Sequence, residues 1–224
     1  MAYKIKDGKD WTLWRSPAVE HESQEMVAQL GRSYRQFKQT FTGFDSSLTS
    51  QELTVGSLPD IFNVEEQHEK DKEFLNNMGE GFSGYRFYNL FALTSPSPLF
   101  WMLYRDIRTV VRTTLNTEEP LWFQCWMNMH KPDQVLNWHD HKFDYHGYVS
   151  IDPKNSITKF NDPNTGDKYE INNEIGNIYF GPGWDRKHKV CVNEDYSGNR
   201  ITLGYDIHTQ PDLPDDQFSL IPLL

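Results

Sequence analysis

The segment that decides the fold is Trp122–His130 (WFQCWMNMH), which reads as a β-strand with two contrasting faces. Alternate residues of a strand point to opposite sides of a sheet. One parity is wholly apolar: Phe123, Cys125, Met127 and Met129. The segment Arg200–His208 (RITLGYDIH) divides in the same way. The pattern predicts a sheet whose apolar face packs on a core. Its polar face points to solvent or, as Trp122 and Trp126 favour, into a lined cavity.

Other short segments rich in aromatic and β-branched residues surround these two and alternate with turn residues. The expected strands are Leu121–His130, Val135–His139, His146–Ile151, Ile157–Asn161, Tyr169–Ile171, Asn177–Phe180, His188–Val192 and Arg200–Ile207. About eight short strands at this spacing indicate a double-sheet jelly roll, also called a double-stranded β-helix, over residues 119–208.

The preceding residues, 1–116, have a mixed and helix-rich pattern. Apolar residues recur at helical spacing in Val19–Phe41 and in Leu99–Leu115. Residues 42–60 read as a loop, and Glu65–Asn77 as a short exposed helix. We therefore expect an α+β fold with the N-terminal helices packed on one sheet. The 224 residues are expected to form a single domain, with residues 209–224 as an irregular tail.

The composition disfavours several classes of partner and location. Asp and Glu number 32 against 22 Lys and Arg, so the net charge of −10 disfavours nucleic acid and anionic membrane surfaces as partners. The longest apolar run, Leu99–Tyr104, is far shorter than the roughly 20 residues of a membrane span. Two cysteines, Cys125 and Cys191, make no disulfide framework, which favours a reducing cytoplasmic location. The remaining expectation is a small-molecule or peptide substrate.

The histidines suggest a metal. Six of the 8 histidines lie between residues 130 and 208. In the segment His139-Asp140-His141, the two histidines are two residues apart, so a strand directs both to the same side. His188 lies 49 residues further on, after a glycine turn, where a jelly roll brings the chain back. Three protein ligands with open positions are typical of a catalytic metal site.

A second feature lies twelve residues after His188. Arg200 opens the last long strand, and Thr202 lies two residues on, on the same face. A guanidinium beside a hydroxyl is a good site for a carboxylate, because it gives bidentate contacts and one further hydrogen bond. Asn128, on the polar face of Trp122–His130, is a further candidate for lining the same pocket.

These motifs together resemble those of the iron(II)- and 2-oxoglutarate-dependent oxygenases. The similarity covers Trp126–Ile207 and is greatest to the 2OG-Fe(II) oxygenase group of marine bacteria and phages. The segments that carry it are Trp126–Met129, His139–His141, Gly147–Pro153, Gly176–Trp184, His188 and Arg200–Thr202.

The resemblance implies a non-haem iron(II) enzyme that uses 2-oxoglutarate and O₂ as co-substrates and usually hydroxylates its substrate. It makes His139 and His188 iron ligands, and Arg200, helped by Thr202, the site for the distal carboxylate of 2-oxoglutarate. The superfamily pattern has a carboxylate where His141 stands. His141 is the favoured third ligand, because it shares the side of His139, and Asp140, Asp144 or no third ligand are the alternatives.

Two other readings stay open. A cupin-type metalloenzyme, a dioxygenase or isomerase without 2-oxoglutarate, also uses a His-x-His pair but needs no arginine clamp. A non-catalytic jelly-roll binding or structural protein would need no metal at all. For the other histidines, the sequence predicts a rim position for His130, a different facing for His146 because of its opposite parity, and a distant position for His208.

Overall fold

The computed structural model describes residues 1–40, 82–83, 89–94, 97–132, 137–162, 165–210 and 219–224. Eleven strands within them form two antiparallel sheets. The large sheet has the order β1-β2-β8-β5-β10-β4-β11, with β3 also paired to β4. Its strands are β1 (Tyr3–Asp7), β2 (Thr12–Arg15), β3 (Phe82–Ser83), β4 (Trp122–His130), β5 (Tyr145–Asp152), β8 (Asn177–Pro182), β10 (Arg200–His208) and β11 (Ile221–Pro222).

The small sheet has the order β7-β6-β9, formed by β6 (Ser156–Asn161), β7 (Lys168–Asn173) and β9 (Lys187–Val192). His139 adds to its edge through an isolated bridge with His188 of β9. Successive segments of the chain from β4 to β10 move between the two sheets, and neighbours in a sheet come from distant parts of the sequence. This is the arrangement of a jelly roll, as the sequence predicts.

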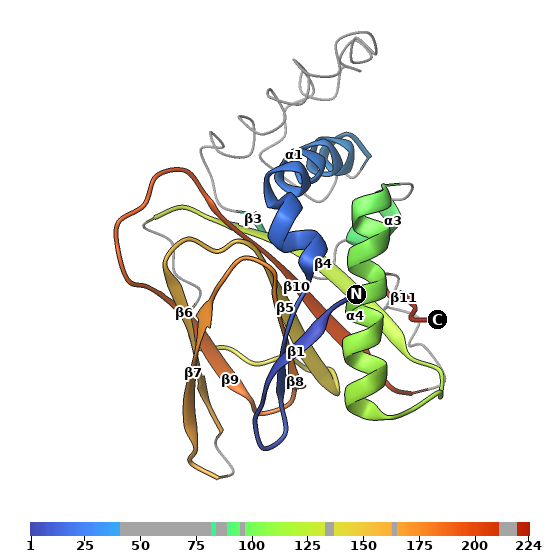
Figure 1. Cartoon of the computed structure of the whole chain (residues 1–224), viewed down its shortest axis with the longest axis vertical. Coiled ribbons are helices and arrows are strands. Elements are labelled where there is room, and N and C mark those ends of the chain that lie inside the picture. Colours follow the sequence, from blue (N-terminus) through green and yellow to red (C-terminus); the bar gives the residue numbers. More distant parts are fainter. Residues whose placement is uncertain (41–81, 84–88, 95–96, 133–136, 163–164, 211–218) are drawn as a thin grey trace, which may run out of the picture.

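Helices cover the outer face of the large sheet. They are α1 (Pro17–Thr40), α3 (Leu90–Thr94) and α4 (Pro98–Leu115). Figure 1 shows α1 and α4 on one side of the large sheet and β6, β7 and β9 on the other. Helix α4 begins after Ser97, whose hydroxyl accepts from the backbone of Phe100, and ends at Asn116 in the left-handed conformation.

The main core lies between these helices and the large sheet. Strands β10 and β4 each contribute the alternate residues that are apolar in sequence. These are Ile201, Leu203, Tyr205 and Ile207 of β10 and Phe123, Cys125, Met127 and Met129 of β4. From α4 the core receives Phe100, Leu103, Ile107, Val110 and Val111. The prediction of N-terminal helices packed on one sheet is therefore confirmed, and the opposite face of the sheet is left for the second sheet and a site.

Some expectations differ from the structure. The first part of the helix-rich region forms β1 and β2, which extend the large sheet through pairing of β2 with β8. These strands carry no long alternating pattern, because β1 is exposed throughout and β2 has only four residues. The tail, expected to be irregular, includes β11, which pairs with β4. Of the expected strand Val135–His139, only the bridge at His139 is present among the described residues.

The loop predicted for residues 42–60 and the helix predicted for Glu65–Asn77 lie outside the described residues. No helix within the described part of the chain is long and apolar enough to cross a membrane.

Candidate metal and carboxylate site

A cavity of about 330 Å³ lies between the two sheets. That volume is at the lower end of the range for small-ligand pockets. The large sheet contributes residues from the polar faces of β4, β5 and β10, and the small sheet contributes residues of β6, β7 and β9. The lining residues are Trp126, Asn128, His130, His139, Asp140, His141, His146, Tyr148, Thr158, Asn173, His188, Val190, Arg200, Thr202 and Gly204.

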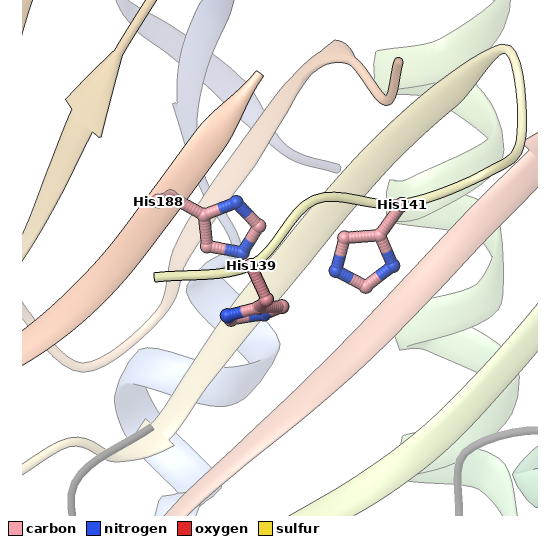
Figure 2. Close-up of side chains that lie close together, drawn as sticks. All are labelled: His139, His141 and His188. Carbon is pink, nitrogen blue, oxygen red and sulfur yellow. The ribbon is translucent and has the colours of Figure 1, made fainter. Parts of the chain in front are cut away.

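Three histidines meet in this cavity. His139, His141 and His188 each offer a ligand atom, and these atoms all lie within 4.8 Å of one another. Figure 2 shows one ring nitrogen of His141 and one of His188 turned towards His139. The bridge between His139 and His188 brings the two segments together, with backbone hydrogen bonds of 3.1 and 2.8 Å. The structure therefore brings together the three histidines selected from their spacing.

The other ring nitrogen of each histidine is held by an acceptor. Nδ1 of His139 lies 2.7 Å from the carbonyl oxygen of Asn137, and Nδ1 of His188 lies 3.2 Å from that of Arg186. Nδ1 of His141 lies 3.0 Å from Oδ1 of Asp206. Carbonyl and carboxylate oxygens only accept, so Nδ1 is the donor in each ring and Nε2 keeps its lone pair. Such contacts fix the ring orientation that a metal requires.

Burial favours the neutral form of two of these rings, those of His139 and His188. Desolvation, together with the neighbouring histidines His146, His139 and His141, holds the pKa of His188 well below its usual value. Desolvation also lowers the pKa of His139, despite the hydrogen bond to Asn137. A neutral imidazole is the form that binds a metal ion.

The prediction that His146 faces away from His141 is wrong. The chain between Asp140 and Tyr145 bends instead of continuing as a strand. This bend returns His146 to the cavity side, where its ring stacks on His141 at 3.6 Å between centroids and 10° between planes. Desolvation and the neighbouring His141 lower the pKa of His146 to about 3.

Asp206 is the site residue that sequence analysis missed. Its side chain is fully buried, and Oδ1 lies 3.0 Å from Nδ1 of both His141 and His146. Burial opposes ionisation, but the interactions with His141 and His146 outweigh it and lower the pKa of Asp206. One signal was available: Asp206 has the same parity as Arg200 and Thr202.

Arg200 is the first residue of β10 and lines the cavity at the opposite end of this strand from Asp206. Its side chain is 3% exposed, and no carboxylate of the described residues forms an ion pair with it. A guanidinium nitrogen of Arg200 donates a hydrogen bond to Nδ1 of His130, at 3.0 Å. Burial lowers the pKa of Arg200 to about 10, which leaves it cationic at neutral pH. Burial, with the charge of Arg200, lowers the pKa of His130 to about 4, so His130 is a neutral acceptor.

The neighbouring residues shape the cavity between these two ends. Asn128 and Thr202 form a cross-strand pair of β4 and β10 and both line the cavity. Nε1 of Trp126 donates to Oδ1 of Asn128 at 3.1 Å. A Cβ on Gly204 would lie 2.5 Å from Cζ2 of Trp126, so this position has room only for glycine while the indole stays in place.

The alternative carboxylates lie differently. Asp140 is exposed and lines the cavity, and it belongs to neither group of potential metal ligands found among the described residues. Oδ2 of Asp144 accepts from the backbone and the hydroxyl of Thr209, both at 2.8 Å, and lies 3.6 Å from His208. Asp144 and His208 therefore belong to a contact away from the lining residues, as expected for His208.

Neither a protein-family model nor a curated protein matches this chain. Solved structures do match. A 2OG-Fe(II) oxygenase-family oxidoreductase from Burkholderia pseudomallei is 10% identical with a TM-score of 0.42, and the match covers 51% of this chain and 60% of that protein. The match thus spans less than two thirds of that protein's length.

Two further structures match over similar lengths. A prolyl-4-hydroxylase from Pseudomonas putida is 10% identical with a TM-score of 0.41, covering 52% of this chain and 69% of that one. An alpha-ketoglutarate-dependent non-heme epimerase of nogalamycin biosynthesis is 13% identical with a TM-score of 0.38, covering 60% and 67%. The structural neighbours thus include 2OG-Fe(II) oxygenases, but at such identities and TM-scores the function has to be argued from the site itself.

Proposed function

We propose that this protein is a non-haem iron(II)- and 2-oxoglutarate-dependent oxygenase. The observation that carries the proposal is one cavity with two complementary features. Three histidines that each offer a ring nitrogen meet in it, and a buried arginine without a carboxylate partner among the described residues lines it. A buried cation is costly unless it is paired, so Arg200 fits an anion from outside the chain.

The donor set suits the metal. Imidazole nitrogens bind iron(II) well, and three ligands from one side leave positions open for co-substrate and O₂. We assign His139, His141 and His188 as the ligands. When iron(II) and 2-oxoglutarate are bound, they supply oxidation of a substrate C–H bond by O₂, with conversion of 2-oxoglutarate to succinate and CO₂. The protein's residues orient the reactants and exclude water.

The co-substrate assignment rests on Arg200. Its guanidinium would bind the distal carboxylate of 2-oxoglutarate, with Thr202 and Asn128 beside it as hydrogen-bonding groups. The low exposure of Arg200 strengthens such a contact, because little water competes for the guanidinium. Membership of the group found in marine bacteria and phages remains a prediction from the sequence, as does a cytoplasmic location.

The substrate is proposed as a small molecule or a peptide, since the cavity is of small-ligand size and the net charge is −10. Hydroxylation is the proposed outcome because it is the usual one in the family that the motifs resemble. No nucleic-acid partner is proposed.

A cupin-type dioxygenase or isomerase is the second candidate. The observation that favours it is the ligand set, which consists of three histidines without a carboxylate. Iron oxygenases that use 2-oxoglutarate commonly have two histidines and one carboxylate. The two candidates differ in Arg200, since a cupin reaction has no need of a buried carboxylate clamp.

The test is an anaerobic titration of the metal-free protein with iron(II), followed by 2-oxoglutarate. We expect iron binding and then a weak visible charge-transfer band when the 2-oxo acid chelates the metal. Arg200→Ala should bind iron as before but need far more 2-oxoglutarate to develop the band. Arg105→Ala removes an exposed arginine of α4 and should behave as wild type.

Iron binding without a band at any 2-oxoglutarate concentration would reject the proposal in favour of the cupin-type enzyme. Failure to bind iron would leave a non-catalytic jelly-roll protein.

A further inference from the structure

We infer that Asp206 supplies the carboxylate of this metal site. It does not bind the metal itself but acts through a hydrogen bond to the ligand His141. The inference rests on the proposed function, because it assumes that His141 binds the metal. It makes Asp206 a positioning residue and explains how a site with a histidine at the usual carboxylate position can work.

The geometry of His141 supports this role. Its ring lies between Asp206 on one side and the other two histidines on the other side (Figure 2 shows the latter). Nδ1 is 3.0 Å from Oδ1 and 3.3 Å from Oδ2 of Asp206. Because the carboxylate can only accept, it holds the proton on Nδ1 and leaves Nε2 to a metal.

Charge supports the same role. Three neutral imidazoles leave the full charge of a divalent ion uncompensated in a buried site, whereas two histidines and a carboxylate remove one unit of it. Asp206 is fully buried and lies 3.0 Å from Nδ1 of His141. Its hydrogen bond draws the His141 proton towards the carboxylate and makes the imidazole a more basic ligand. The negative charge missing from the ligand set is thus supplied indirectly.

His146 completes the arrangement. Its Nδ1 donates to Oδ1 of Asp206 at 3.0 Å, and its ring stacks on that of His141. This second donor fixes the carboxylate, and the stacked ring fixes the plane of His141. Without His146, Asp206 would keep one donor and could rotate.

His141, His146 and Asp206 also form a group with metal-ligating atoms within 4.8 Å. The rings argue against a second metal there. They are nearly parallel, with planes 10° apart and centroids 3.6 Å apart, so an ion between their Nδ1 atoms would lie out of the plane of both rings. Both Nδ1 atoms also carry protons towards Asp206. The group is a hydrogen-bonded support for His141.

The first test measures affinity for iron(II), and for cobalt(II) as a spectroscopic probe, by anaerobic titration without co-substrate. Asp206→Asn keeps the size of the side chain but removes its charge. We expect about a 10- to 100-fold loss of affinity, and a change in the visible spectrum of the cobalt protein. Asp144→Asn is the matched control, because Asp144 pairs with His208 away from the cavity, and it should behave as wild type.

A double-variant experiment makes the test specific. His141→Asp places a carboxylate in the ligand set, where the resemblance leads one to expect it. If Asp206 acts through His141, adding Asp206→Asn to this variant should change metal affinity by less than about threefold. An equal loss in both backgrounds would overturn the inference, because Asp206 would then act by general charge or by structure.

Nitrogen NMR of the wild-type protein provides a measurement that needs no folded variant. In the metal-free protein His141 should carry its proton on Nδ1, and a diamagnetic divalent ion such as zinc should shift Nε2. A proton on Nε2, or a metal on Nδ1, would overturn the inference. Wild-type protein that binds no metal would reject the proposed function, whereas metal affinity unchanged by Asp206→Asn would reject only this inference.

Discussion

The two faces of strand β10 are equally buried but differ in what they contact. Leu203 and Ile207 on one face have no exposure and pack in the core beneath the helices. Arg200, Thr202 and Asp206 on the other face are at most 6% exposed and line or support the cavity. Burial alone therefore does not identify the site. The distinguishing property is the charge buried on one face, which lowers stability unless it is paired.

This difference implies that the two faces of the sheet have separate roles, one in stability and one in ligand binding. The apolar face contributes stability through burial of hydrocarbon. The cavity side holds histidines, the carboxylate of Asp206 and the buried cation of Arg200. The core face should thus control folding with little effect on ligands, and the cavity face should control ligands and pH dependence.

The largest expected effect is on the core face. Leu203→Ala removes a fully buried side chain and should lower the free energy of unfolding by about 3 kcal/mol. Denaturant unfolding measures the loss, and titration of the folded variant measures iron affinity, which should stay at the wild-type value. A parallel fall in iron affinity would break the proposed division between the faces.

Low pH should destabilise the protein through the histidines of the cavity. The pKa of buried His146 is about 3 in the folded protein and about 6.5 in an unfolded chain. Below pH 6.5 the unfolded chain therefore binds the extra proton, and stability falls as pH decreases from about 6.5 towards 3. From pH 7 to pH 5, His146 alone should reduce the stability of the metal-free protein by about 2 kcal/mol.

Unfolding curves at several pH values measure this slope. His146→Gln should make the slope less steep without abolishing it, because His130, His139 and His188 also have lowered pKa values. His21→Gln, which changes an exposed histidine of α1, should leave the slope unchanged. A slope that is the same in His146→Gln as in wild type would show that another group causes the acid sensitivity.

Removal of the buried Arg200 cation should have a smaller effect on stability, and of opposite sign. Arg200→Met replaces a buried guanidinium with an apolar side chain and should raise the stability of the ligand-free protein by about 1 kcal/mol. The same variant should lose the extra stability that 2-oxoglutarate gives to the wild-type iron protein. Thermal unfolding with and without the co-substrate checks both parts. Lower stability without ligand would mean that Arg200 is a structural residue.

The smallest predicted effect concerns the acceptor of Arg200. His130→Ala removes the hydrogen bond that orients the guanidinium. It should weaken 2-oxoglutarate binding by about threefold, well under 1 kcal/mol, and leave iron affinity unchanged. Calorimetric titrations with iron(II) and with 2-oxoglutarate measure the two affinities separately. A change in iron affinity would show that His130 influences the metal end of the cavity.

The sequence predicts the parts of the fold that depend on local periodicity. The parity of β4 and β10 is visible in each strand alone, and so is the shared side of His139 and His141. The distance from His141 to His188 matches the return of the chain in a jelly roll. These features need no knowledge of how strands align with one another.

The contacts that sequence analysis did not predict depend on alignment between strands. His146 pairs with Asp206 across β5 and β10, and His130 pairs with Arg200 across β4 and β10. No pattern within one strand fixes such a register. His146 was misjudged also because the chain bends just before Tyr145, which reverses the parity that a regular strand would give.

The most direct test of the central claim is X-ray absorption of the iron(II)-loaded protein, with and without 2-oxoglutarate. We expect scattering from three imidazole rings in the wild-type protein, two in His188→Ala, and replacement of bound water when 2-oxoglutarate is added. Iron surrounded only by oxygen ligands, or a spectrum that His188→Ala leaves unchanged, would contradict the account.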